Sequence, residues 1–281
     1  MIKLLTFYKE IRVGSSLPLI VGGNDGIKYV VKARGSGDGV LASVVEWLSI
    51  KLGLLIQIPI LKPEFLIIDT SFSLLAQDPE IRELLERSVG INFGTKYVEG
   101  VSIFNEQHVF DIDSNLKNNI FLYDLFLLNI DRSYKNTNMI INNNDLWCLD
   151  YSSSMTMKSL VEAKVYQQEE VFLREIKKHP FYSDEITAND FIEKIRCIED
   201  KSISDIVEEL PLEWIRQLNI AKETKEIISI LRKGLIEKKN QVESLRIRLE
   251  LLKTLEIETD KERNLRTLKN KNSFREKFGK I

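Results

Sequence analysis

The stretch Asn129–Asp150, NIDRSYKNTNMIINNNDLWCLD, carries the strongest structural and functional signal in the chain. Asp131 follows an apolar run that predicts a buried helix over 118–129, Asn136 comes five residues later, and a predicted hairpin leads back to Asp150. Phosphoryl transfer uses one carboxylate to orient the attacking hydroxyl, and an amide and a second carboxylate to hold Mg²⁺ on the phosphates. Asp and Asn are also common in turns, so Asp131 could cap a turn and Asp150 could end a strand; this loop alone is as consistent with that interpretation as with a catalytic site.

A second pair of charged residues lies in the N-terminal third. The strand KYVVKAR presents Lys32 among apolar residues, and the next predicted helix carries Glu46 within the apolar run VVEWLS. Kinase-like folds use a strand lysine on the α- and β-phosphates and a helix glutamate that holds this lysine. The alternative is that Glu46 faces solvent and Lys32 is an ordinary strand residue. The order of all these segments along the chain favours the kinase interpretation.

The other patterns predict a small sheet followed by helices. Asn24-Asp25-Gly26 predicts a hairpin turn, and Gly53 is expected to end the first helix. Pro211 is expected to start a late helix that contains Trp214. The expected strands are 17–21, 27–33, one or two around 59–69, 91–100, 139–142 and 146–150; the expected helices are 41–53, 79–88 and 118–129, and the chain after 155 is expected to be helical.

A heptad rhythm runs from Ile228 to Leu252, with apolar residues in steps of three and four interrupted by Lys238. Such a seam can form a coiled-coil dimer, or a long amphipathic helix that packs on its own domain. The apolar residues Ile247, Leu251 and Leu255 widen the stripe beyond a narrow seam and favour the second interpretation.

The composition excludes several classes of protein. Two Cys and two His argue against a disulfide scaffold and against a Cys-rich or His-based metal site. No stretch approaches eighteen uninterrupted apolar residues, and the N-terminus lacks a signal-peptide core, so we expect a cytoplasmic protein. Residues 261–281 carry a charge of +6 and the first 260 residues carry −8. This basic tail can contact nucleic acid, an acidic partner or an anionic surface, but a solvated helix end is favoured.

The chain resembles the HipA-like kinase domain family and, more distantly, the phosphoinositide lipid kinases. The resemblance covers roughly residues 10–220 and rests on NIDRSYKNTN and LWCLDY, with weaker matches in GSSLPLIV, NDGIKYVVKARG, VVEWLSIKLGL and ELPLEWI. It implies that Asp131 is the catalytic acid/base or hydroxyl-orienting residue, and that Asn136 and Asp150 bind Mg²⁺. Asn138 could replace Asn136 as the metal ligand, but the five-residue offset favours Asn136.

The same resemblance assigns roles in the N-terminal third. It implies that Lys32 binds the α- and β-phosphates, that Glu46 anchors Lys32, and that Gly14, Ser15 and Ser16 approach phosphate through backbone N–H groups. Contacts to adenine are expected near residues 96–101.

The chain departs from its relatives at three places. It has no G-x-G-x-x-G loop, and the metal-binding Asp is followed by Tyr151-Ser152 rather than Phe-Gly. Lipid kinases often have His two residues after the catalytic Asp, where this chain has Ser133, which makes a lipid substrate less favoured.

We therefore expect an α+β, two-lobed protein-kinase-like fold. The N-lobe is expected over 1–104, the helical C-lobe over 105–220, and a helical, partly basic extension over 221–281. The expected function is that of an ATP- and Mg²⁺-dependent serine/threonine protein kinase with a protein acceptor. The alternatives are a catalytically inactive nucleotide-binding interaction module and a lipid or small-molecule kinase. A homodimer or a partner could use the C-terminal helix.

Overall fold

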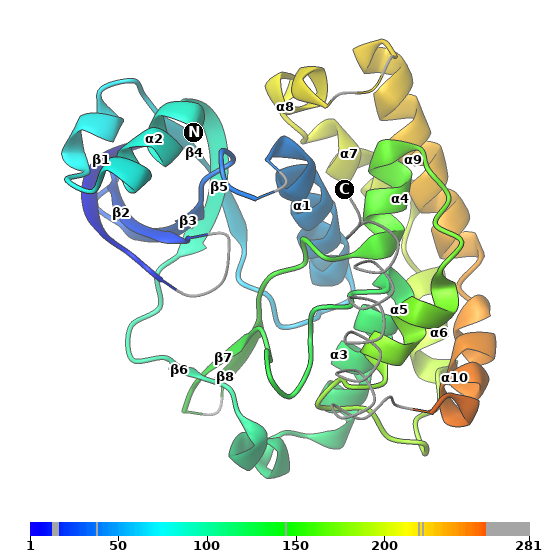
Figure 1. Ribbon diagram of the computed structural model, residues 1–281. Helices are drawn as coiled ribbons and strands as arrows, with labels where there is room; N and C mark the ends of the chain where they lie inside the picture. The colour runs from blue at the N-terminus through cyan, green and yellow to red at the C-terminus, as the bar shows by residue number, and fades with distance from the viewer. Residues whose placement is uncertain (13–16, 38, 144, 219, 221, 257–281) are drawn as a thin grey trace, which may run out of the picture.

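The protein consists of a small β-barrel followed by a larger helical part (Figure 1). A computed structural model describes residues 1–12, 17–37, 39–143, 145–218, 220 and 222–256. Among these residues, no helix is both long enough and apolar enough to cross a membrane. The expected lobe boundaries after residues 104 and 220 stay predictions.

The barrel closes in the strand order β1-β2-β3-β5-β4. Its interior is filled by alternate strand residues such as Leu19, Tyr29 and Leu66, and one end is covered by α2 and the 3₁₀ turn η1. A small separate sheet has the order β6-β7-β8. The bounds are β1 (Ile2–Glu10), β2 (Leu19–Gly23), β3 (Lys28–Lys32), β4 (Pro63–Ile68), β5 (Gly90–Lys96), β6 (Ser102–Ile103), β7 (Met139–Asn142), β8 (Asp145–Cys148), η1 (Phe72–Leu75) and α2 (Pro79–Arg87).

The predicted turn at 24–26 joins β2 to β3. Gly26 has a φ of 78°, a conformation that costs glycine little because it has no Cβ. The Asp25 carboxylate accepts hydrogen bonds from the Ile27 backbone and from the Tyr29 hydroxyl, at 3.1 and 2.6 Å. These contacts fix the register that places Tyr29 inside the barrel.

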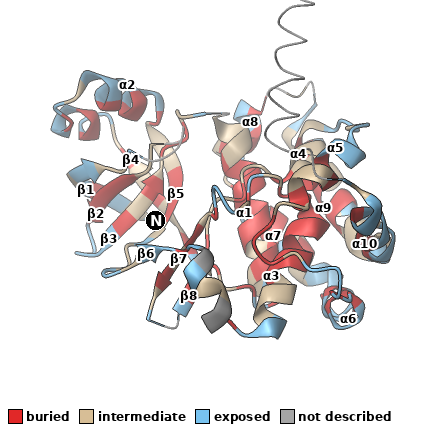
Figure 2. Ribbon diagram, turned by 60° about the horizontal axis from the view of Figure 1, so that its bottom comes forward, coloured by how far each residue is buried: buried red, intermediate tan, exposed pale blue. Residues whose placement is uncertain are grey.

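The helical part is built around α1, α3, α7 and α9, where buried residues concentrate (Figure 2). Although α1 follows β3 in the chain, it packs against α4, α7 and α8. The bounds are α1 (Val40–Leu55), η2 (Glu106–Asp111), α3 (Ser114–Leu127), α4 (Met155–Glu162), α5 (Glu169–Ile176), α6 (Asn189–Arg196), α7 (Asp200–Glu208), α8 (Leu212–Gln217), α9 (Thr224–Asn240) and α10 (Ser244–Thr254).

Some local predictions are corrected by the structure. Gly53 does not end α1, which continues to Leu55; a Cβ at Gly53 would lie 2.7 Å from Ile60 and 3.0 Å from Tyr123, so the glycine permits close packing. The buried helix begins at Ser114 rather than Asn118, because the Asp113 side chain caps it. The strand β1 was not predicted.

The heptad segment forms two helices, α9 and α10, instead of one long helix. Its seam faces the interior of the same chain, as the packing interpretation expected, although Ile247 and Leu251 are exposed and do not widen the buried stripe. The buried seam residues are Leu231, Leu235, Val242, Leu245, Leu249 and Leu252.

An aromatic cluster joins the barrel to the helical part. Trp47 of α1 stacks on Phe65 of β4, with ring centroids 4.0 Å apart, and Trp214 of α8 meets both rings edge-on. Phe93 of β5 is paired with Phe65 in register and therefore faces the same cluster. The Trp214 indole N–H donates to the Ile91 carbonyl at 2.7 Å.

We predict that Trp214→Ala lowers the free energy of unfolding by about 3–5 kcal/mol, the usual cost of emptying a buried aromatic site. Trp214 has 0% exposure and also holds a strand carbonyl. Leu212→Ala in the same helix is the control: Leu212 is 50% exposed, so its loss should cost about 0.5 kcal/mol or less. Urea denaturation measures both, and equal effects would show that the cluster does not stabilise the junction.

Candidate functional site

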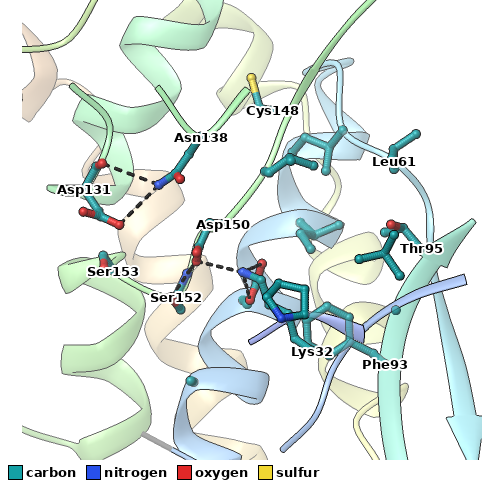
Figure 3. A pocket seen from close by; sticks show the side chains of 18 of the residues that line it. Lys32, Leu61, Phe93, Thr95, Asp131, Asn138, Cys148, Asp150, Ser152 and Ser153 are labelled. Atoms are coloured by element: carbon teal, nitrogen blue, oxygen red, sulfur yellow. Dashed lines mark hydrogen bonds and ion pairs between the residues drawn. The ribbon is translucent and has the colours of Figure 1, made fainter. Parts of the chain in front are cut away.

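A cavity of about 890 Å³ lies between the barrel and the helical part. Figure 3 shows side chains that line it, with Asp150 between Lys32 on one side and Asp131 with Asn138 on the other in that view. The residues that line it include Lys32, Ser36, Gly37, Gly39, Ser43, Glu46, Phe93, Lys96, Tyr97, Val98, Val101, Asp131, Asn136, Asn138, Asp150 and Ser152.

Strand alternation and register direct Lys32 into this cavity. Tyr29 and Val31 point into the barrel, so Val30 and Lys32 point outward. Lys32 pairs in register with Phe93, which puts it on the sheet face that meets α1. There its ammonium contacts both Glu46 carboxylate oxygens, at 2.8 and 3.0 Å.

Lys32 also contacts Asp150, at 2.9 Å, so one ammonium serves two carboxylates. Burial opposes charge on Lys32, but Glu46 and Asp150 outweigh it and raise the pKa of the ammonium. Glu46 is only 4% exposed, and burial raises its pKa even though the charge of Lys32 acts in the opposite direction. The more exposed Asp150 keeps a lowered pKa, because Lys32 and Ser152 outweigh its burial. Asp150 therefore carries its negative charge more readily than Glu46.

The loop after α3 brings three polar side chains to the other side of the cavity. The Asn138 amide donates to an Asp131 carboxylate oxygen at 3.2 Å, and the Asn136 amide donates to the Asp131 backbone carbonyl at 3.2 Å. Both amides therefore use their N–H groups on Asp131, an arrangement that suits their carbonyl oxygens to act as acceptors or metal ligands.

A buried ion pair beneath this loop holds its shape. The Arg132 guanidinium and the Asp124 carboxylate both have 0% exposure and contact one another. Arg132 also donates to the backbone carbonyls of Thr137, Asn138 and Leu149, the last of which immediately precedes Asp150. One side chain thus links α3, the Asp131 loop and the end of β8.

His179 completes this buried group as a neutral ring. Its Nδ1 accepts a hydrogen bond from the Phe181 backbone at 3.0 Å, so the proton belongs on Nε2, which lies 3.0 Å from Asp124. Burial, with some help from the Arg132 charge, lowers the pKa of His179, although Asp124 opposes the shift. Burial acts to raise the pKa of Asp124, but Arg132 and His179 hold it below its usual range.

The structure brings most of the sequence-predicted residues to one cavity. Lys32, Glu46, Asp131, Asn136 and Asp150 all line it, and so do Lys96, Tyr97, Val98 and Val101 of the segment expected near adenine. Gly14, Ser15 and Ser16 lie outside the described residues.

Sequence reasoning missed the support beneath the site. Asp124 is a charged residue in the middle of an otherwise apolar helix, which signals a buried partner. The partners Arg132 and His179 lie 8 and 55 residues away, and nothing in the spacing identifies His179.

The donor set fits a magnesium ion better than a softer metal. An Asp150 carboxylate and an Asn136 or Asn138 amide offer hard oxygen atoms. In the described part of the chain, no three His, Cys, Asp or Glu side chains gather as a metal cage. Mg²⁺ at nucleotide sites takes few protein ligands and completes its shell with phosphates and water, so a sparse donor set is what it requires.

Comparisons with known proteins concern the family and the fold. A family model described as HipA-like kinase matches residues 5–242. A solved structure, described as the crystal structure of a Helicobacter pylori proinflammatory kinase, CtkA, is 12% identical; the match covers 88% of this chain and 95% of that chain, with a TM-score of 0.52. No curated protein matches the sequence. At this identity the likeness concerns the fold, and it confirms the expected α+β two-lobed kinase-like architecture.

We predict that the free energy of unfolding falls as the pH decreases below about 6.5. The unfolded chain binds a proton at His179 near the ordinary pKa of 6.5, whereas the folded chain does so only at its lowered pKa. The contribution of His179 to the free energy of unfolding is therefore fully present above pH 6.5. It decreases below that pH, by at most about 1.4 kcal/mol per pH unit for one proton.

His179→Gln tests the origin of this slope, because glutamine can donate to Asp124 but does not titrate. Chemical denaturation at pH 7.5, 6.5 and 5.5 should show a smaller slope for the variant than for the wild type. An unchanged slope would assign the acid sensitivity to other groups.

Proposed function

The chain belongs to the HipA-like kinase family and is therefore a phosphotransferase, and we propose that it transfers the terminal phosphate of ATP, with Mg²⁺, to a serine or threonine hydroxyl of a protein. The observation that carries the proposal is that one cavity gathers Lys32, Glu46, Asp131, Asn136 and Asp150. A kinase requires a cation for the phosphates, oxygen ligands for the metal and a carboxylate for the acceptor hydroxyl.

In this proposal Lys32 holds the α- and β-phosphates while Glu46 fixes the direction of its ammonium. The pair is bidentate in the structure, so the lysine is already aimed into the cavity. When a nucleotide enters, its phosphates can replace Asp150 as the second anion beside Lys32. Asp150 then becomes available as an oxygen ligand, together with Asn136 or Asn138.

Bound Mg²⁺ would neutralise charge on the transferred phosphate. Asp131 is proposed to orient the acceptor hydroxyl and to receive its proton. The Asn138 contact to one Asp131 oxygen holds the carboxylate in place and leaves the second oxygen to face the acceptor. In Figure 3, Lys32 lies on the far side of Asp150 from Asp131, which suits a division between phosphate binding and acceptor activation.

We predict that Lys32→Met weakens ATP binding about 10-fold or more, because a hydrogen bond between charged groups is lost. The fold should persist, since Glu46 can take up a proton when its cation is removed. Lys28→Met on the same strand is the matched control, because Lys28 lies outside the cavity and pairs with Glu99. Titration calorimetry measures both; equal affinities for the two variants would exclude Lys32 from phosphate binding.

A further prediction distinguishes the role of Asp150 in nucleotide binding from the role of Asp131 in phosphoryl transfer. ATP with Mg²⁺ at a hundredfold excess over its dissociation constant should stabilise the wild type by about 2.7 kcal/mol, a melting shift of several degrees at roughly 2–4 °C per kcal/mol. Asp150→Asn should lose most of this shift. Asp131→Asn should keep it and yet lose phosphoryl transfer by roughly 10²–10⁴-fold.

Asp145→Asn provides the matched control on the same hairpin, because Asp145 is exposed and outside the cavity. Transfer is followed with radiolabelled ATP and protein, lipid and small-molecule acceptors. Wild-type binding without transfer to any acceptor would favour the inactive nucleotide-binding module. If neither Asp131→Asn nor Asp150→Asn alters binding or transfer, the assigned roles are wrong.

A further inference from the structure

A glycine-rich loop between β3 and α1 faces the same cavity, and the proposed function assigns it no role. It follows Lys32 and leads into α1, with Ser36, Gly37 and Gly39 lining the cavity. Gly37 and Gly39 have φ values of 53° and 64°, conformations that favour glycine and let the backbone turn sharply before the helix. Asp38, between them, lies outside the described residues.

The first turn of α1 has the properties of an anion-binding helix end. The helix has 16 residues, its N-cap Gly39 makes no side-chain cap, and its first turn contains no acidic residue. The first backbone N–H groups of a helix have no partner within the helix, and the helix dipole makes this end positive. Among the other described α-helices, α2, α3 and α4 receive a side-chain oxygen at this end, whereas α5 to α10 have no side-chain cap, like α1, so the open helix end alone does not define a site.

Ser43 gives independent support, because this mostly buried residue lines the cavity and its hydroxyl has no hydrogen-bond partner among the described residues. Ser43 is 5% exposed and lines the cavity. Within the part of the chain that is described, its hydroxyl takes part in no hydrogen bond. Ser49, two turns later in α1, shows the usual alternative: its hydroxyl donates to the Val45 carbonyl at 2.8 Å and lies away from the cavity.

Ser43 is also close to the phosphate-binding lysine proposed above. It precedes Glu46 by three residues on the same helix face, which corresponds to a rise of about 4.5 Å along the axis. Glu46 contacts Lys32 directly. A phosphate chain that begins at Lys32 can therefore reach the first turn of α1 with its next phosphate.

We propose that Ser43, with the backbone N–H groups of the first turn of α1 after Gly39, binds the terminal phosphate of the nucleotide. The inference rests on the proposed function and adds a phosphate-binding element that is separate from the 14–16 loop and from Lys32. It predicts that the site discriminates nucleotides by the length of their phosphate chain, because this element meets only the phosphate farthest from the base.

The test measures the affinities of AMP, ADP and a non-hydrolysable ATP analogue, each with Mg²⁺, by titration calorimetry on the full chain. Ser43→Ala should lower the affinity for the ATP analogue about 10-fold and leave the affinity for AMP unchanged. Only the longer nucleotide loses a hydrogen bond between a hydroxyl and a charged oxygen. Ser43→Asp should lower the affinity for the ATP analogue further, because the introduced carboxylate repels the phosphate. Ser49→Ala is the matched control and should leave the three affinities at wild-type values.

The outcomes separate this inference from the kinase proposal. Wild-type affinity of Ser43→Ala for the ATP analogue would overturn the phosphate site, and so would an equal loss for AMP and the ATP analogue. Ser43→Ala removes one oxygen atom only, and an unchanged melting temperature will verify that it folds. Failure of the wild type to bind the ATP analogue would contradict the kinase proposal itself.

Discussion

The buried contact between Arg132 and Asp124 is the constraint on which the site depends. An isolated charge without exposure is very costly, so each of these residues requires the other. Because Arg132 also donates three N–H groups to the carbonyls of Thr137, Asn138 and Leu149, the pair fixes the loop and the strand end that carry the polar side chains of the cavity. The Arg132–Asp124 pair therefore contributes both to the stability of the fold and to the geometry of the site, and a change to this pair would alter both.

The other half of the site arises from the junction of the two parts of the molecule. Lys32 belongs to the barrel, whereas Glu46 belongs to α1, which packs with the later helices. Their contact therefore forms only when barrel and helices are correctly joined. The aromatic cluster around Trp214 and the ion pair between Arg34 and Glu213 act at the same junction. This arrangement makes the lysine orientation a consequence of tertiary packing rather than of local sequence.

The difference between locally determined positions and positions set by tertiary packing explains how much of the site could be predicted from the sequence. The positions of Lys32, Asp131 and Asp150 follow from local periodicity and from short spacings, and all three line the cavity. The helix that carries Glu46 was also predicted, but its end was wrong at Gly53, because close packing against Ile60 and Tyr123 decides that position rather than a helix stop. His179 could not be found, because a histidine 55 residues from Asp124 leaves no periodic trace. The sequence thus shows the residues that face the cavity more readily than those that hold them in place.

Three residues beside the buried Arg132–Asp124 pair have a left-handed backbone conformation. Leu128, Asn138 and Asp150 have φ values of 52°, 46° and 56°, in the left-handed region that costs a residue other than glycine about 1 kcal/mol or more. Asn and Asp tolerate this region better than Leu, which has no polar side chain to compensate. All three lie beside the buried pair: Leu128 ends the helix of Asp124, and Arg132 bonds the carbonyls of Asn138 and Leu149. Such conformations persist where surrounding contacts over-determine them. The buried pair supplies those contacts, and the turns it enforces direct Asn138 and Asp150 toward the cavity.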